Sequence, residues 1–360
     1  MDMLIEGKGD TFYRLSNSEG KQWLIPARNM RVALNIYQPT GRNGKLLKSL
    51  FPLLHRIPLV RKAIGAQIER CKLNDEINDL LESVFNHRQL EFAVFFGTPC
   101  VHQKITVQIS RQDRILGYFK ISDNPEIASL FRHEAAILDE LYDKGVRNIP
   151  KALYCGKLND GRAIFVQSTV KSGSSEVMEH WSPMHDEFVG TLYRKTHKTV
   201  RFETSDYFRT LTELRNRMEW LPDYMNVGMI TAAIDDIISG WQGKDVDYSA
   251  YHGDFTPWNT FAEAGRLFVF DWEYAGLSYP PMLDRYHFFT QTAIFKRHAT
   301  AEDIIRFLQT DEAGWVDRQT YKLYLIEIIA RFTLREKGNI CGNLEGSMKI
   351  WGTLLNYLQQ

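Results

Sequence analysis

Cysteine is scarce in this sequence of 360 residues. The four cysteines lie far apart, at Cys71, Cys100, Cys155 and Cys341. They form no C-x-x-C pair and no zinc-type spacing, so the pattern indicates neither a metal-stabilised fold nor a disulfide framework. The first residues contain no basic segment followed by an apolar run, and we therefore expect no signal peptide. These absences predict a cytoplasmic protein with reduced thiols.

Excess charge and long apolar runs are missing as well. The 44 lysines and arginines balance the 44 aspartates and glutamates, so there is no global positive field and we expect no nucleic-acid partner. No window approaches the roughly 18 consecutive apolar residues of a transmembrane helix. Hydrophobic residues make up 44% and charged residues 24% of the chain, which is typical of a globular protein.

Three regions of the sequence differ in their pattern of apolar and polar residues. We interpret residues 1–90 as an N-terminal extension, 91–170 as a strand-rich domain and 171–360 as a mainly helical domain. In the second region, short apolar segments bounded by Gly, Pro, Asn or Asp predict strands, and apolar residues at three- and four-residue spacing predict a helix. The strands are expected at 92–97, 104–110, 117–122 and 163–170, and the helix between Pro125 and Leu141.

The N-terminal extension combines predicted strands with a basic segment. The strands are expected at 11–14, 22–26 and 30–38. From 42 to 72, eight lysines and arginines are interleaved with leucines and isoleucines. We expect Pro52 and Pro58 to break this segment into short helical pieces. Two interpretations stay open: an amphipathic stretch that packs on the main domain, or a surface that touches anionic lipid.

Polar residues concentrate between 249 and 278, where the helical texture of the third region is interrupted. Asp254 is followed five residues later by Asn259, and an apolar strand then leads to Asp271. This spacing is typical of phosphoryl transfer, in which an Asp meets the acceptor hydroxyl while an Asn and a second Asp meet a metal. Mg²⁺ favours such a sparse set of oxygen ligands. We expect the three side chains to converge on one triphosphate–metal cluster.

Three segments carry a resemblance to a known family: HGDFTPWN (252–259), VFDWEYAG (269–276) and YPPMLD (279–284). In them the sequence resembles the aminoglycoside phosphotransferase and choline kinase family, whose fold is similar to that of protein kinases. The resemblance implies an α+β, two-lobed protein-kinase-like fold. This fold would have a small antiparallel-sheet N-lobe with one helix and a larger, mainly helical C-lobe, to which this chain adds its N-terminal extension.

The resemblance also implies roles for the matching residues. Asp254 would be the catalytic base, and Asn259 and Asp271 would bind Mg²⁺. His252 would brace the loop. Asp284 would be a buried anchor that hydrogen-bonds the loop without taking part in the chemistry.

The region before this loop agrees with the same interpretation. Lys120 lies on the third predicted strand of the N-lobe, and Glu134 lies fourteen residues later in the predicted helix. In kinase-like folds such a Lys holds the α- and β-phosphates of ATP and pairs with such a Glu. The segment 165–170 resembles the hinge that holds adenine through its backbone, which makes Ser168 and Val170 nucleotide-binding candidates. The loop at 97–104 lacks the G-x-G-x-x-G pattern, and we expect backbone N–H groups near 98–102 to contact phosphate instead.

We therefore expect an ATP- and Mg²⁺-dependent phosphotransferase that acts on a hydroxyl of a small molecule or glycan. The basic segment 42–72 favours a sugar carried on lipid at the inner membrane surface. A choline-like or aminoglycoside acceptor would call for acidic residues, and Asp235, Asp236, Asp245 and Asp247 are either such a site or ordinary surface. A nucleotide-binding pseudokinase or scaffold is the alternative from another class. A protein kinase is disfavoured, because the loop reads H-G-D and the D-F-G and A-P-E segments are missing.

Overall fold

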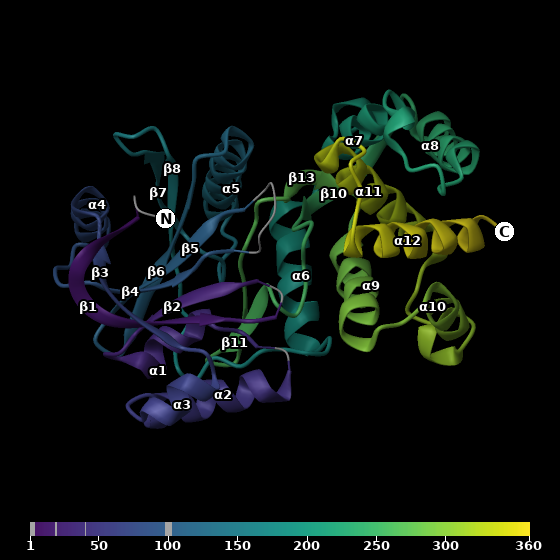
Figure 1. Cartoon of the computed structure of the whole chain (residues 1–360). Coiled ribbons are helices and arrows are strands. Elements are labelled where there is room, and N and C mark those ends of the chain that lie inside the picture. Colours follow the sequence, from purple (N-terminus) through teal and green to yellow (C-terminus); the bar gives the residue numbers. More distant parts are fainter. Residues whose placement is uncertain (1–3, 19, 40, 98–102) are drawn as a thin grey trace. The chain divides into compact units, whose positions relative to one another are not determined.

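The computed structural model describes residues 4–18, 20–39, 41–97 and 103–360, and the chain divides into two compact units (Figure 1). The first unit contains the residues up to Tyr142 together with Arg147–Glu176 and Ala262–Glu273. The second contains Asp143–Val146, Val177–Phe261 and Tyr274–Gln360. The first unit is built on a sheet and the second is mainly helical, as the resemblance implies.

The first unit is organised by one eight-stranded antiparallel sheet, in the order β3-β1-β2-β4-β5-β6-β8-β7. Its strands are β1 (Ile5–Ser16), β2 (Gln22–Pro26), β3 (Gln67–Leu73), β4 (Glu91–Phe95), β5 (Ile105–Arg111), β6 (Arg114–Ser122), β7 (Ala152–Lys157) and β8 (Ala163–Ser168). The sheet is therefore larger than the expected N-lobe, because strands from residues 1–90 extend it.

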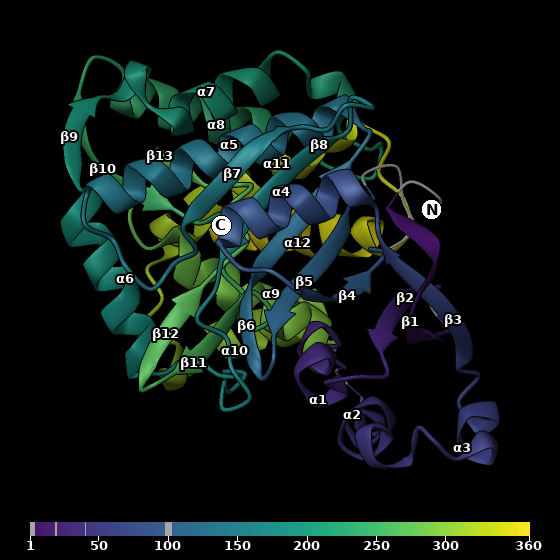
Figure 2. The ribbon, with the colours of Figure 1, turned by 90° about the vertical axis from the view of Figure 1, so that its left-hand side faces the viewer.

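Both faces of this sheet are covered, and the two-residue period of a strand decides which side chain meets which cover. Helix α4 (Asp75–Phe85) packs on one face, where Phe119 of β6 is buried, and Figure 2 shows this helix lying across the strands. Lys120, the next residue, points to the opposite face and reaches α5 (Pro125–Asp143). The alternation of β6 thus places a lysine on the α5 side of the sheet.

Two local predictions in the first ninety residues are wrong. Residues 30–38 form no strand but a helical turn, α1 (Met30–Ala33), followed by the 3-10 turn η1 (Leu34–Ile36). Met30, Ala33 and Leu34 are buried in the core under β1 and β2, and this three- and four-residue spacing suits a helix. Pro52 does not break its helix, because α2 (Arg42–Leu54) continues two residues beyond it.

The break in the basic segment comes at Pro58, which begins α3 (Pro58–Ala63). A proline is well tolerated in the first turn of a helix, where its missing N–H has no intrahelical acceptor. Pro52 lies in the last turn of α2 instead, beside the buried Phe51. Packing of Phe51 against the sheet therefore outweighs the cost of one lost backbone hydrogen bond.

The three-part division at residues 90 and 170 stays a prediction about folding units. In the structure, β1, β2 and β3 belong to the same sheet as β4. The elements β3, α4 and β7 were not expected from the sequence.

The second unit packs seven helices among its described residues: α6 (Pro183–Thr196), α7 (Asp206–Arg215), α8 (Val227–Trp241), α9 (Leu283–Arg297), α10 (Ala301–Leu308), α11 (Arg318–Glu336) and α12 (Asn343–Gln359). Helix α11 is buried on most sides and contacts α7, α9 and α12. A helix that is apolar on most sides belongs in an interior. Two polar residues of α11, Glu327 and Arg331, therefore need partners inside the unit.

Short strands interrupt the helices where the polar segment was identified. Strands β9 (Lys198–Arg201), β10 (Asp245–Tyr251) and β13 (Gly276–Tyr279) form a three-stranded sheet. Strands β11 (Thr260–Glu263) and β12 (Arg266–Val269) form a two-stranded sheet. Among the described residues, no helix is both long enough and apolar enough to cross a bilayer.

Candidate active site

The loop that follows β10 is held in place by a buried carboxylate. Asp284, in the first turn of α9, accepts hydrogen bonds from the backbone N–H groups of His252, at 3.0 Å, and Gly253, at 3.3 Å. Burial raises the pKa of Asp284 to about 7, although these two N–H groups act in the opposite direction. The prediction that Asp284 is a buried anchor of the loop is confirmed.

The backbone of this loop requires a glycine and a histidine. Gly253 has a φ of +83°, and a Cβ at this position would lie 2.5 Å from the carbonyl oxygen of Tyr274. His252 is fully buried, and its Nδ1 accepts a hydrogen bond from the backbone N–H of Asp254 at 3.1 Å. The predicted bracing role of His252 is confirmed. The pair His-Gly therefore sets the direction in which the Asp254 side chain leaves the loop.

The carboxylate of Asp254 is partly exposed and is oriented by two side chains. Asn259 donates from Nδ2 to Oδ2 of Asp254 at 2.7 Å, and His287 of α9 donates from Nε2 to Oδ1 at 3.0 Å. The structure thus brings Asp254 and Asn259 together. The prediction that Asn259 binds a metal stays a prediction; since its amide nitrogen donates to Asp254, the metal would meet its carbonyl oxygen.

No motif in the sequence indicated His287 as a site residue. Its burial within a network of polar side chains explains why its ring is neutral. Its Nδ1 lies 3.4 Å from the Tyr324 hydroxyl and 3.5 Å from Nη2 of Arg331. Burial lowers the pKa of His287 to about 4, so the ring is neutral and carries its proton on Nε2 when Asp254 is ionised. Arg331 also donates to the carbonyl oxygen of Gly253 and pairs with Glu327. One spacing signal existed, since His287 lies one helical turn after Asp284.

A second group of predicted residues meets in the first unit. The ammonium of Lys120 lies 2.6 Å from Oε2 of Glu134 and 2.5 Å from Oδ1 of Asp271. Lys120 and Glu134 are almost fully buried. The ion pair between strand and helix is present as expected, and its role in nucleotide binding stays a prediction.

The charge states of this pair follow from burial and neighbours. Burial alone would lower the pKa of Lys120, but Asp271 and Glu134 outweigh it, and the pKa lies above its usual value. Burial raises the pKa of Glu134, while Lys120 opposes the rise. The backbone N–H of Trp272 also donates to Oε1 of Glu134 at 3.2 Å. Glu134 therefore joins β6, α5 and the segment after β12.

Two further residues belong to this group. Lys104, just before β5, lies 2.5 Å from Oε2 of Glu273 and 3.4 Å from Oδ1 of Asp271. No pattern in the sequence marked Lys104 as a site residue. Glu273 is buried.

The carboxylates of this group fit a magnesium ion by their chemistry. Glu134, Asp271 and Glu273 each offer an oxygen, and these oxygens lie within 4.8 Å of one another. Carboxylate oxygens are the hard ligands that Mg²⁺ prefers. The prediction that Asp271 binds a metal stays a prediction, supported by this donor set.

The two hinge candidates are Ser168 and Val170. The N–H of Ser168, at the end of β8, donates to the carbonyl oxygen of Lys151 at 3.0 Å, and its hydroxyl accepts from the N–H of Lys151 at 2.9 Å. Ser168 therefore has its backbone donor engaged within the sheet. Val170 is exposed. The predicted phosphate contacts near 98–102 lie outside the described residues.

The predicted site residues thus form two groups, one in each unit. Lys120, Glu134 and Asp271 meet in the first unit, and Asp254 and Asn259 meet in the second. The predicted convergence of Asp254, Asn259 and Asp271 on one triphosphate–metal cluster stays a prediction.

Three of the four acidic residues considered for a cationic acceptor have surface partners. Asp235 pairs with Arg215, Asp245 with Arg201, and Asp247 bonds Thr199. These side chains are exposed, which is ordinary helix and strand surface. The alternative interpretation as ordinary surface is the one that these contacts favour.

The sheet unit, the helical unit and the strand–helix Lys–Glu pair define the protein-kinase-like fold. No protein-family model and no curated protein matches the sequence. Solved structures do match. A thermostable mutant of aminoglycoside phosphotransferase APH(4)-Ia, in a ternary complex with ADP and hygromycin B, has a TM-score of 0.51 at 12% identity over 79% of this chain and 98% of that chain.

Two further solved structures resemble the chain in the same way. Another mutant of APH(4)-Ia, in complex with AMP-PNP and hygromycin B, has a TM-score of 0.51 at 13% identity over 79% of this chain and 98% of that chain. Choline kinase LicA from Streptococcus pneumoniae has a TM-score of 0.49 at 18% identity, over 79% of this chain and 97% of that chain. The two structures with a TM-score of 0.51 confirm the expected fold class.

Proposed function

We propose that this protein is an ATP-dependent phosphotransferase with an alcohol group as acceptor. The observation that carries the proposal is the arrangement at Asp254, a partly exposed carboxylate on a rigid loop with both oxygens oriented by Asn259 and His287. A carboxylate held in this way can accept the proton of a hydroxyl as the phosphoryl group is transferred. The solved structures of APH(4)-Ia with ADP or AMP-PNP support nucleotide binding by the same fold.

Each group of residues has a task in this reaction. Lys120 would hold the α- and β-phosphates of ATP, with Glu134 fixing the position of its ammonium. Val170 and Ser168 would lie beside the adenine. Asn259 and Asp271 would hold Mg²⁺, which supplies charge neutralisation on the triphosphate when bound. The protein contributes position and electrostatics rather than a covalent intermediate.

The proposal is tested by an ADP-release screen over sugars, amino alcohols, aminoglycosides and lipid-linked glycans. With the acceptor found, Asp254→Asn should lower turnover by about a thousandfold or more, because the isosteric amide cannot accept the proton. Asp236→Asn, an exposed aspartate of α8, is the matched control and should retain activity. Full turnover by Asp254→Asn would overturn the assignment of the base. Nucleotide binding that ignores Mg²⁺, with no ADP release from any acceptor, would favour the pseudokinase alternative.

For the acceptor, we propose a glycan carried on lipid at the anionic inner face of a membrane. Helix α2 buries Phe51 against the sheet but exposes Leu46, Leu50 and Leu53, at 59%, 41% and 63%. These leucines recur at four and three residues, so they share one face of the helix. Ile57 and Leu59 continue the exposed apolar surface toward α3.

Basic residues accompany these exposed side chains. Arg42, Lys45, Arg56 and Lys62 are exposed within the same segment. Exposed leucines with lysines and arginines beside them match the composition of a helix that lies on an anionic bilayer. The proposal therefore places the enzyme in the cytoplasm, in peripheral contact with the membrane through 42–72.

A further inference from the structure

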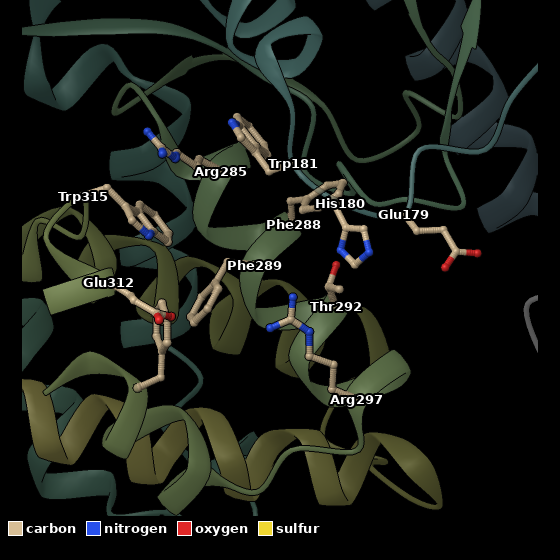
Figure 3. A pocket seen from close by; sticks show the side chains of 11 residues that line it. Glu179, His180, Trp181, Arg285, Phe288, Phe289, Thr292, Arg297, Glu312 and Trp315 are labelled. Atoms are coloured by element: carbon tan, nitrogen blue, oxygen red, sulfur yellow. The ribbon is translucent and has the colours of Figure 1, made fainter. Parts of the chain in front are cut away.

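The helical unit contains a pocket of about 370 Å³, lined by α9, α10 and the segment before α6 (Figure 3). This volume falls in the range of roughly 300–1,000 Å³ that small-ligand sites occupy. Figure 3 shows Trp181, Arg285 and Trp315 toward one end of the pocket and Thr292 and Arg297 toward the other. Aromatic faces and polar groups thus line the same hollow.

A buried hydroxyl in the wall of the pocket lacks a partner within the described part of the chain. Thr292 is 4% exposed, and its Oγ1 forms no hydrogen bond with any described residue. A buried hydroxyl without a partner is costly, so native structures rarely keep one without reason. Since Thr292 lines the pocket, a polar group of a bound ligand is the partner that its hydroxyl fits.

An arginine in the pocket lies within cation–π distance of two indole rings. The guanidinium carbon of Arg285 lies 5.6 Å from the ring centre of Trp181 and 4.4 Å from that of Trp315. The aromatic neighbours limit the motion of the guanidinium, and its N–H groups match a carboxylate or phosphate in a bidentate manner. Within the described residues, no carboxylate forms an ion pair with Arg285.

The charges around the pocket favour an anion over a cation. Arg285 and Arg297 both line it. Of the two lining glutamates, Glu179 lies 3.9 Å from the ammonium of Lys296, and Figure 3 shows its carboxylate directed away from the other labelled side chains. Glu312 is the remaining acidic group of the lining. Arg285 and Arg297 bring two positive charges, and among the described residues Glu312 is the one lining carboxylate that is not beside a lysine. The net charge of the lining is therefore positive.

The pocket adjoins the loop that carries Asp254. The ring of Phe255, the residue after Asp254, lies 5.9 Å from Trp181 and 6.3 Å from Phe288, which both line the pocket. Phe288 follows His287, the residue that donates to Asp254. The same turn of α9 therefore orients the candidate base and forms the pocket wall.

We infer that this pocket binds a sugar unit that carries a carboxylate or phosphate group, as part of the acceptor whose hydroxyl meets Asp254. That the ligand is part of the acceptor rests on the proposed function. That the pocket binds an anionic sugar rests on the pocket alone. Arg285, positioned by Trp181 and Trp315, binds the anionic group, and Thr292 bonds a sugar hydroxyl.

The test is a calorimetric titration of the full chain with a matched set of hexoses: glucose, glucosamine, glucuronic acid and glucose-6-phosphate. Only the two anionic sugars should bind, and a response to either of them supports the shared chemistry. Arg285→Gln should weaken that binding at least tenfold. Arg318→Gln is the control, because Arg318 also stacks on an aromatic ring of this unit, Tyr357, outside the pocket. Thr292→Val should leave the unliganded protein as stable as before and weaken binding severalfold.

Several results would overturn the inference. These are tighter binding of glucosamine than of the anionic sugars, binding that Arg285→Gln and Thr292→Val leave unchanged, or inorganic phosphate binding as well as glucose-6-phosphate. Repeating the titration with Asp254→Asn measures sugar binding in a protein without the proposed base, so the pocket and the proposed function are judged separately. Binding that depends on Arg285, in a protein that transfers phosphate to no acceptor, would uphold the pocket and remove the proposed function. Transferase activity without Arg285-dependent binding would uphold the proposed function and remove the pocket.

Discussion

At the scale of single residues, Glu134 is the side chain on which most of the first group depends. It is fully buried, pairs with Lys120 and accepts from the N–H of Trp272. Removing one partner of a buried ion pair leaves the other charge without compensation in a low-dielectric interior. Glu134 should therefore matter for stability before any ligand is bound.

We expect Glu134→Gln to lower the free energy of unfolding by about 2–4 kcal/mol, because the amide keeps one hydrogen bond but loses the charge that balances Lys120. Asp139→Asn on the same helix is the control and should change stability by less than about 0.5 kcal/mol, since Asp139 is exposed. Urea unfolding of the three proteins measures the difference. Equal stability of both variants would mean that Asp271 alone balances Lys120.

The residues of the site differ in how visible they are in the sequence. Asp254, Asn259 and Asp271 lie close together along the chain, so their spacing alone could suggest phosphoryl transfer. Lys104 and Arg331 lie far from that segment and belong to no motif that the sequence displays. Their neighbours in space come from other elements, and no local pattern records such contacts.

At the scale of elements, α2 is the one whose two faces differ most clearly. Its inner face packs on the sheet through Phe51, and its outer face exposes leucines beside basic residues. The sequence left two interpretations of this segment open, and the burial pattern accommodates both, since one face is packed while the other is exposed.

We expect the full chain to sediment with vesicles of phosphatidylglycerol but not with vesicles of phosphatidylcholine, since each nearby lysine or arginine contributes about 1 kcal/mol on an anionic surface. The triple variant Leu46→Gln, Leu50→Gln, Leu53→Gln should weaken binding at least about tenfold, because the apolar contact is lost. Val227→Gln, at another exposed apolar residue, is the control. Equal sedimentation of the triple variant, or none with either vesicle, would contradict a membrane surface at α2.

Helix α9 has several roles, because the helical repeat places its residues on different faces. Asp284 anchors the loop, His287 orients Asp254, and Arg285 and Thr292 line the pocket. Residues three or four apart share a face, whereas adjacent residues point in different directions. Only Asp284 was marked by the sequence, because the motif YPPMLD ends on it.

At the scale of the whole molecule, two buried titratable groups act on stability in opposite directions. The folded pKa of Asp284, about 7, exceeds the unfolded value of about 3.9, so its contribution is present at low pH and is lost as pH rises toward 7. The folded pKa of His287, about 4, lies below the unfolded value of about 6.5, so its contribution is present above 6.5 and is lost as pH falls toward 4.

We therefore expect His287→Gln to cost less stability in acid than at neutral pH. Between about pH 7.5 and about pH 5.5, the difference from the unmodified protein should shrink by about 1 kcal/mol. Asp284→Asn should show the opposite trend and cost less at the higher pH. His298→Gln, at an exposed histidine, is the control. Urea unfolding at both pH values measures the slopes, and a cost of His287→Gln that is constant with pH would contradict a buried neutral ring.

The sequence by itself determined the class of fold, the reactive loop and the order of the helices in the second half. These depend on short-range spacing: a motif within about thirty residues, an apolar strand before Asp271, and three- and four-residue periods. Such patterns are visible in the sequence because local backbone geometry determines the spacing of buried residues.

Only the tertiary structure decided that the first ninety residues extend the sheet, that 30–38 is helical, and that His287 and Arg331 support the loop of Gly253 and Asp254. It also decided which of the many aromatic and basic side chains line a pocket. These outcomes depend on contacts between segments far apart in the chain. Burial against such distant partners outweighs local preference, and a single sequence does not display those partners.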